Sequence, residues 1–149
     1  NFDAAVSAMA LMDMAEIEPL FKALKKLINP GGSFVFAIMH PCFNSIHTIL
    51  GAELIEKETK IYTEYHVKVK SYIKPSKVKG LAIDNQPTAH IYFHRPLHTL
   101  LNTAFKFGFT LDGLEEPTFT PEITTKNTDI SWSRFSEIPP VIVARLRII

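Results

Sequence analysis

Two residues that can do chemistry, a histidine and a cysteine, stand on either side of a proline where an apolar stretch of the chain ends. The sequence NPGGSFVFAIMHPCFN, residues 29–44, leads from a Gly-rich turn through an apolar run to His40, Pro41 and Cys42. An imidazole titrates near neutral pH, so His40 could take a proton from a hydroxyl or an amine. A histidine that closes a strand can equally be held by local hydrogen bonds alone, and both interpretations stay open. Cys42 belongs to no partnered histidine motif and is expected to be an unreactive thiol.

Three more histidines are spaced by four residues in the segment HIYFHRPLH. On one continuous helix, His90, His94 and His98 would point to the same side and could hold zinc. The letters IYF favour a strand, however, and Pro96 begins a helix, so the three side chains should diverge. Since no motif of the HExxH type supports a metal site, we expect none.

The elements that position these residues follow from the apolar pattern. Residues 33–39 are apolar on both faces, which is typical of a parallel strand covered by helices on each side. Residues 2–12 predict a buried strand that leads into a loop, with a helix as the alternative that the alanine and methionine residues leave open. Between them lies a predicted helix with Pro19 in its first turn, and residues 29–32 end it. Its expected buried face is Ile17, Leu20, Phe21, Leu24, Leu27 and Ile28. Strand, helix, turn and strand together predict a right-handed βαβ unit.

The middle of the chain has a different pattern. In residues 44–93, YTEYHVKVKSYI alternates and predicts an antiparallel or edge strand, and KPSKVKGLAIDNQP predicts a loop. We interpret this region as an excursion above the sheet, so that residues 1–149 form a single domain. A helix from Pro96 to Gly108, a strand in FTLDGLEEP, a polar loop over residues 117–136 and a closing strand in PVIVARLRII complete the chain. The expected buried face of that helix is Leu97, Leu100, Leu101 and Ala104.

The composition is that of one globular domain. With 149 residues, of which 46% are hydrophobic and 21% charged, the chain can build a sizeable core. The net charge of +1 argues against electrostatic binding of nucleic acid. The basic residues between 68 and 79 are interpreted as part of a solvated strand and loop. No apolar stretch approaches the roughly 20 residues of a membrane span. A single cysteine, Cys42, fits a reducing, cytoplasmic location.

The order of these elements resembles class I S-adenosylmethionine-dependent methyltransferases of the small-molecule type. The resemblance rests on FDAAVSAMALMDM, on PLFKALKKLINPGGSFVFAIMHPCF and on YFHRPLHTLLNTAFKFGFTLDGLEEP, and IPPVIVARLRI is similar to the family's last strand. It implies an α/β fold with the Rossmann-like methyltransferase sheet. This chain would supply the back half, strands four to seven with the last strand antiparallel, and residues 44–93 would be an inserted substrate-side segment. It also implies S-adenosyl-L-methionine as cofactor and a small-molecule methyl acceptor as substrate.

The resemblance implies roles for individual residues as well. Four residues match the strand end that contacts the methionine part of the donor, where plain core packing is the alternative: Ser7, Ala8, Met9 and Ala10. The residues that match the substrate side are Asp13, Pro41, Tyr92, His94 and Arg95, and His40 matches the position of a catalytic base. Asp13 could instead cap a helix with Glu16. Arg95 could bind an anionic acceptor or pair with Glu115 or Glu116.

Two family features are absent from this sequence. The family binds its cofactor through a glycine-rich turn after the first strand and an acidic residue ending the second. The chain starts at Asn1 without methionine, and we expect it to be the C-terminal half of a methyltransferase, inactive alone. Without the first strand, residues 2–8 would be an unpaired apolar edge. We expect that edge to be covered, for example in a homodimer.

Two other protein classes stay open. A non-catalytic α/β interaction or dimerisation module would lack a cofactor site and would act through the open edge. A nucleotide-binding α/β protein of the dehydrogenase type is disfavoured, because HPCF and HRPL have no role there.

Overall fold

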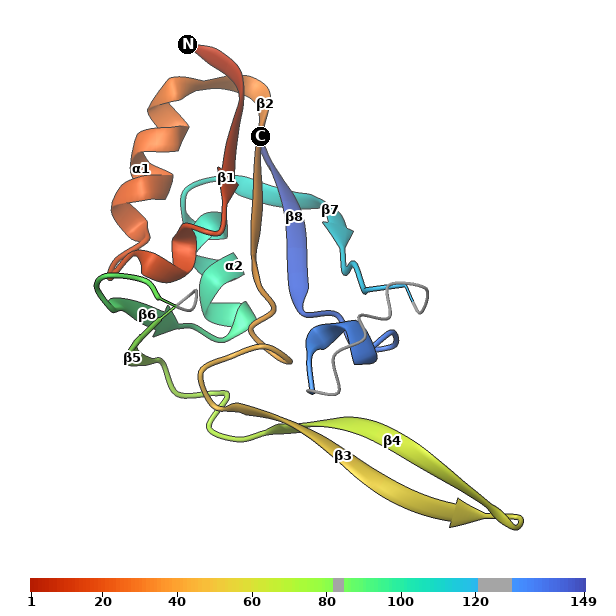
Figure 1. Ribbon diagram of the computed structural model, residues 1–149. Helices are drawn as coiled ribbons and strands as arrows, with labels where there is room; N and C mark the ends of the chain where they lie inside the picture. Colours follow the sequence, from red (N-terminus) through yellow and green to blue (C-terminus); the bar gives the residue numbers. More distant parts are fainter. Residues whose placement is uncertain (82–84, 121–129) are drawn as a thin grey trace.

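The structure is a computed structural model and describes all residues except 82–84 and 121–129 (Figure 1). A sheet carries two helices, and two β-hairpins extend beyond the end of the sheet at which β1 and β2 finish. Both ends of the chain lie at the opposite end of the sheet. None of the helices in the described part of the chain is long and apolar enough to cross a membrane.

The sheet is mixed and has the strand order β1-β2-β8-β7. β1 (Phe2–Ala8) pairs in parallel with β2 (Ile28–Met39). β8 (Val141–Ile148) lies antiparallel to β2, and β7 (Phe109–Glu115) lies antiparallel to β8. The α/β class, the strand–helix–strand unit and the antiparallel closing strand are thereby confirmed.

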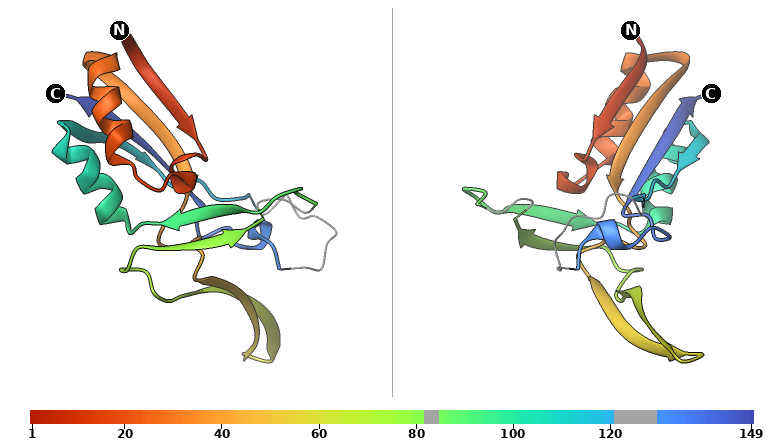
Figure 2. Two further views of the ribbon diagram at one scale, coloured as in Figure 1. Left: turned by 90° about the vertical axis from the view of Figure 1, so that its left-hand side faces the viewer. Right: turned by 45° about the vertical axis from the view of Figure 1, so that its right-hand side comes forward.

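The two helices, α1 (Glu18–Leu27) and α2 (Leu97–Lys106), pack on the same face of the sheet (Figure 2). They cover a core built from alternate residues of the strands, among them Phe34, Phe36, Ile38, Ile142, Ala144 and Leu146. The prediction that helices cover both sides of residues 33–39 is therefore wrong for this chain. Since no helix of the described residues lies on the other face, Val35 and Ala37 are only partly buried there.

The start of β2 also differs from the prediction. Leu27, expected on the buried face of α1, is 48% exposed at the end of that helix. Residues 29–32 are not a separate turn but belong to β2, where Gly31 has a φ of 77° and the pairing with β1 shifts register. A positive φ suits glycine, which has no Cβ, so Gly31 accommodates the irregular stretch of β2 between Ile28 and Ser33.

β1 is an edge strand. Its residues Phe2 and Val6 are 63% and 78% exposed, so the prediction of a buried strand is wrong for the chain by itself. The reason is that the described residues supply no strand on the outer side of β1. The unpaired apolar edge expected for residues 2–8 is present.

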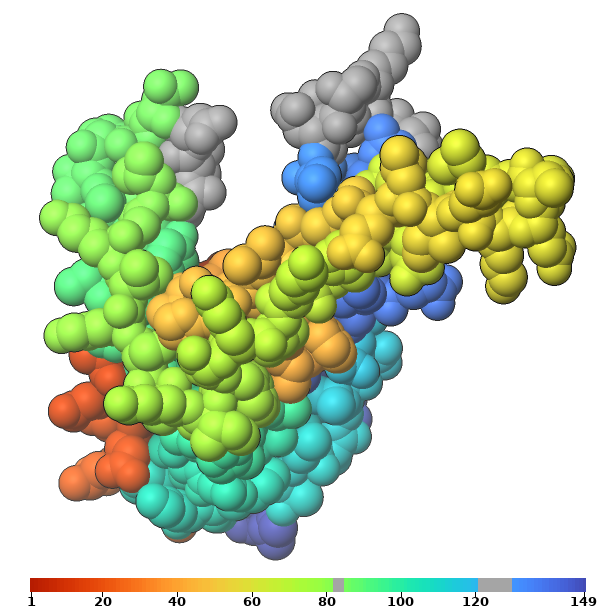
Figure 3. All heavy atoms as spheres, turned by 90° about the horizontal axis from the view of Figure 1, so that it is seen from below, coloured from red at the N-terminus to blue at the C-terminus, as the bar shows by residue number. Residues whose placement is uncertain are grey.

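The excursion over residues 44–93 consists of two hairpins. β3 (Thr48–Lys57) pairs with β4 (Lys60–Val69), and this hairpin projects from the body of the molecule (Figure 3). β5 (Ser76–Gly80) pairs with β6 (His90–His94). The alternating strand is confirmed, but β5 lies inside a segment predicted to be a loop.

Two shorter elements and the polar loop complete the description. The 3-10 helices are η1 (Leu11–Asp13) and η2 (Trp132–Arg134). The polar loop predicted over residues 117–136 is described only at its ends, and its middle lies outside the described residues.

Candidate functional site

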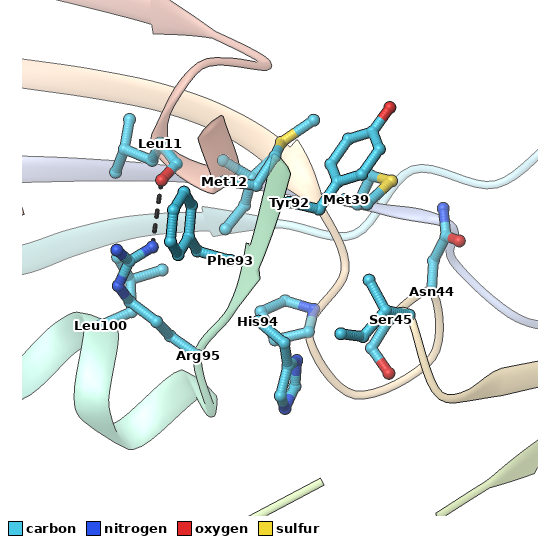
Figure 4. A pocket seen from close by; sticks show the side chains of 13 residues that line it. Leu11, Met12, Met39, Asn44, Ser45, Tyr92, Phe93, His94, Arg95 and Leu100 are labelled. Atoms are coloured by element: carbon cyan, nitrogen blue, oxygen red, sulfur yellow. Dashed lines mark hydrogen bonds between the residues drawn. The ribbon is translucent and has the colours of Figure 1, made fainter. Parts of the chain in front are cut away.

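A pocket lies at the carboxyl ends of β1 and β2, between η1, the segment that follows β2, and β6 (Figure 4). It contains about 440 Å³ of empty space, part of it open to solvent. Its apolar lining consists of Leu11, Met12, Ile38, Met39, Pro41, Ile46, Phe93 and Leu100, and its polar lining of Asn44, Ser45, Tyr92, His94 and Arg95. Open α/β sheets bind ligands at the carboxyl ends of their parallel strands.

The structure brings most of the predicted substrate-side residues together. Pro41, Tyr92, His94 and Arg95 all line this pocket. Asp13 stands beside it in η1, where it contacts His90 rather than the lining. Because the sequence distance between Pro41 and Tyr92 is large, this convergence depends on how β6, at the end of the excursion, returns to the carboxyl ends of β1 and β2.

The four predicted cofactor residues lie at the end of β1, directly before the lining residues Leu11 and Met12. The backbone N–H of Met9 donates to the carbonyl oxygen of Ala37, 2.8 Å away, so β1 stays joined to β2 up to its last residue. Met9 has a φ of 52°, in the left-handed region that non-glycine residues rarely adopt. Such backbone positions cluster at ligand sites. Ser7, Ala8 and Ala10 present small side chains around it.

Arg95 holds η1 against the pocket. Its guanidinium donates to the carbonyl oxygens of Leu11, at 3.2 Å, of Ala15, at 2.8 Å, and of Met14. It also lies over the ring of Phe93. Burial lowers the pKa of Arg95 from its ordinary value. The alternative of an ion pair with Glu115 or Glu116 is not formed.

Asp13, His90 and Tyr92 form a cluster beside the pocket. His90 Nε2 lies 3.4 Å from Asp13 Oδ1, and the His90 ring is tilted against the Tyr92 ring with 4.3 Å between centroids. The Gln86 amide donates to His90 Nδ1 at 2.9 Å, so the proton of a neutral His90 ring is on Nε2, toward Asp13. Since α1 begins without a side-chain cap, the capping role considered for Asp13 is not formed.

Burial raises the pKa of the Tyr92 hydroxyl, and the nearby charge of Asp13 raises it further. We expect Asp13→Asn to lower the pKa of Tyr92 while leaving it above the ordinary value, because burial is the larger cause. Ultraviolet titration of tyrosinate measures this shift, and subtraction of a Tyr92→Phe titration assigns the signal. Asp3→Asn, on β1 and bonded to Asn29, is the matched control. An unchanged or raised Tyr92 pKa in Asp13→Asn would contradict this electrostatic contact.

His40 is buried and lies outside the pocket lining, with both ring nitrogens bonded. The backbone N–H of Cys42 donates to Nδ1 at 3.1 Å, so Nε2 carries the proton of the neutral ring and donates to Glu116 Oε1 at 2.7 Å. The ring also packs on Phe43. These contacts tie the end of β2 to the segment after β7. They favour the local hydrogen-bonding interpretation of His40, and its role as a base stays a prediction.

Removing Glu116 should destabilise the protein. In Glu116→Ala, the buried Nε2–H of His40 loses its acceptor, and we expect the free energy of unfolding to fall by about 1–2 kcal/mol. Urea unfolding measures the change. The matched control is Glu115→Ala, an exposed neighbour at the end of β7, for which we expect a change within about 0.5 kcal/mol. Equal effects of the two substitutions would contradict the contact with His40.

The three histidines considered for zinc diverge as expected. His90 faces Asp13, His94 Nε2 lies 2.7 Å from the carbonyl oxygen of Tyr72, and His98 contacts Thr99. Within the described part of the chain, no three His, Cys, Asp or Glu residues are grouped so that they could hold a metal ion.

Two residues near the pocket carry no sequence signal that could have found them. The Tyr72 hydroxyl accepts from the Leu97 backbone N–H at 2.9 Å, and burial is the main cause of its raised pKa, with the Cys42 side chain contributing. His47 Nε2 lies 2.9 Å from Ser76 Oγ. Both residues come from the excursion, where the alternating pattern predicts strands but no tertiary partners.

Comparison with solved structures identifies the fold. A Listeria monocytogenes protein assigned as an S-adenosylmethionine-dependent methyltransferase superposes with a TM-score of 0.70 at 20% sequence identity, covering 99% of this chain and 61% of its own. An S-adenosylmethionine-dependent methyltransferase from Mesorhizobium loti superposes with a TM-score of 0.69 at 23% sequence identity, and the match covers 98% of this chain and 62% of that protein. The chain has the fold of S-adenosylmethionine-dependent methyltransferases.

The methyltransferase fold extends to a more distant structure, the glycopeptide N-methyltransferase MtfA complexed with sinefungin. It gives a TM-score of 0.51 at 11% identity and covers 100% of this chain and 58% of its own. The chain thus spans about three fifths of the length of the methyltransferase structures that it matches. No protein-family model matches the sequence, and no curated protein does either.

Proposed function

We propose that this chain is the acceptor-side half of an S-adenosylmethionine-dependent methyltransferase that acts on a small molecule. The observation that carries the proposal is the pocket at the carboxyl ends of β1 and β2 in a chain with the methyltransferase fold. The order β1-β2-β8-β7 supports an assignment of these strands as four, five, seven and six of a seven-stranded sheet. The match covers only 61% and 62% of the two methyltransferase structures, which supports the same assignment.

S-adenosyl-L-methionine, when bound, supplies a methyl group made electrophilic by a sulfonium centre. The residues at the end of β1 fit one part of this cofactor, because small side chains and the left-handed backbone at Met9 leave main-chain groups accessible beside the pocket. We propose that Ser7, Ala8, Met9 and Ala10 hold its methionine part. The glycine-rich turn and the acidic residue for the remainder would belong to another part of the complete protein.

The pocket lining indicates the character of the acceptor. It is mostly apolar, none of its described lining residues is a carboxylate, and Arg95 adds a positive charge at one side. We propose a neutral or anionic acceptor with an apolar body, bound by Pro41, Tyr92, His94 and Arg95, with Asp13 at the mouth. Methyl transfer requires mainly position and exclusion of water, which this lining can supply.

The exposed edge of β1 favours a second candidate, a non-catalytic α/β interaction or dimerisation module. An unpaired apolar strand is a template for another chain. Under this alternative, residues 2–8 would pair with a second copy in a homodimer. Light scattering at high concentration tests it, and a monomer would contradict it.

We also place the protein in the cytoplasm, since the single cysteine, Cys42, is free.

Calorimetry with S-adenosylhomocysteine tests the leading proposal. We expect binding by the complete protein and weak or no binding by the 149-residue chain. Ala8→Trp should abolish binding by placing a bulky side chain at the end of β1, whereas Ala23→Trp, at an exposed position of α1, should leave it intact. No binding by either the chain or the complete protein would contradict the methyltransferase assignment.

A further inference from the structure

One of the two ring nitrogens of His94 is hydrogen-bonded to the protein backbone. His94 ends β6 with 6% of its surface exposed, and it lines the pocket. Its Nε2 lies 2.7 Å from the carbonyl oxygen of Tyr72. A carbonyl oxygen only accepts, so Nε2 carries the hydrogen, and in the neutral ring Nδ1 presents a lone pair.

The contacts around His94 hold this arrangement. The Tyr72 hydroxyl accepts from the backbone N–H of Leu97 in the first turn of α2, which fixes the residue whose carbonyl binds His94. The rings of Tyr72 and His47 pack edge-on against the His94 ring, at centroid distances of 5.8 Å and 6.2 Å. The orientation of the ring and the position of its proton are therefore set before any ligand binds.

The other nitrogen of His94 is free. Among the described residues, Nδ1 of His94 has no hydrogen-bond partner, and it is not one of the fully enclosed polar atoms that lack one. It therefore retains contact with solvent. Figure 4 shows His94 among the lining side chains, between Arg95 and Ser45. Arg95 cannot act as a base because it only donates, and among the described residues His94 is the one histidine of the pocket lining, since His40, His47 and His90 lie outside it.

We propose that His94 Nδ1 accepts the proton that the methyl acceptor loses, a role that rests on the proposed function. A lone pair of the acceptor oxygen or nitrogen forms the new bond to the methyl carbon. The electron pair of the broken carbon–sulfur bond stays on the cofactor's sulfur, and the acceptor's proton moves to Nδ1. The resulting imidazolium later returns that proton to water. The group that is methylated is therefore an O–H or N–H group of a molecule with an apolar body, and not a carboxylate group, which has no proton to lose.

Long-range ¹H–¹⁵N NMR of the complete protein, with phenol as the probe, tests this role. We expect His94 to show the Nε2–H form, and phenol to shift the Nδ1 resonance and to give contacts to the methyl groups of Met12 and Met39. His94→Gln keeps a donor near the Nε2 position but removes the Nδ1 lone pair, and it should weaken phenol binding about fivefold. The control is His98→Gln, at an exposed position of α2, which should leave phenol binding unchanged.

Two results would overturn the role of His94. One is a ring protonated on Nδ1, and the other is phenol binding that leaves the Nδ1 resonance and the affinity of His94→Gln unchanged. A parallel titration with S-adenosylhomocysteine separates the proposals. If the complete protein binds this compound but phenol does not reach His94, the inference fails and the methyltransferase assignment stands. If it does not bind, the assignment fails, and the base role fails with it.

Discussion

Replacing Arg95 by alanine is expected to release the segment of residues 11–15 and to lower the free energy of unfolding by about 3 kcal/mol. Arg95 donates to the carbonyl oxygens of Leu11, Met14 and Ala15, and hydrogen bonds from a charged group contribute about 1.5–3 kcal/mol each when buried. Partial exposure reduces that sum. Urea unfolding measures the stability, and hydrogen exchange of residues 11–15 measures the release.

Arg95→Lys is the matched comparison. Lysine keeps the positive charge but presents one compact ammonium in place of the planar fork, so it cannot reach all three carbonyl groups at once. We expect an intermediate loss of stability and partial release of the same segment. If Arg95→Lys matched the native protein in both measurements, charge alone would account for Arg95. If Arg95→Ala also matched the native protein in both measurements, the role of Arg95 in holding residues 11–15 would be refuted.

Phe21→Ala is expected to cost about 3–5 kcal/mol, the largest stability effect of any substitution considered for this chain. Phe21 of α1 is fully buried and meets the rings of Phe34 and Phe109 edge-on, at centroid distances of 6.1 Å and 5.7 Å. Its removal leaves a cavity between the helix and the sheet. A loss of this size is a large fraction of the stability of an ordinary domain.

The control for Phe21→Ala is Phe105→Ala. Phe105 lies on α2 and is 42% exposed, so its truncation removes the same atoms without opening an enclosed cavity. We expect a change within about 1 kcal/mol, measured by urea unfolding alongside Phe21→Ala. Similar losses for the two variants would show that α1 does not form the centre of the core.

The elements of the sheet could be predicted from the sequence because their patterns are local. The helical spacing of Phe21 and Leu24, Pro19 in the first turn, and the apolar runs that became β1 and β2 each depend on neighbours a few residues away. The antiparallel closing strand came from the resemblance. The predictions that failed were those of burial, for Leu27, for β1 and for the second face of β2. Burial depends on which other elements cover a residue, and a local pattern does not contain that information.

The candidate site was predicted only in part. Pro41, Tyr92, His94 and Arg95, for which the resemblance implied a substrate-side role, line one pocket, and that role stays a prediction. The sequence could not separate the roles of His40 and His94, since both are histidines at strand ends. Their difference lies in partners distant in the chain. Glu116 and Cys42 occupy both nitrogens of His40, whereas the carbonyl group of Tyr72 occupies only one nitrogen of His94.

Hydrogen exchange of the proposed complete methyltransferase, with and without S-adenosylhomocysteine, tests the central claim most directly. The claim is that the cofactor lies at the carboxyl end of β1, beside the acceptor pocket. We predict that the compound slows amide exchange in residues 7–13 while leaving the exposed hairpin of β3 and β4 unchanged. Binding of the compound with no protection of residues 7–13, or no binding at all, would contradict the claim.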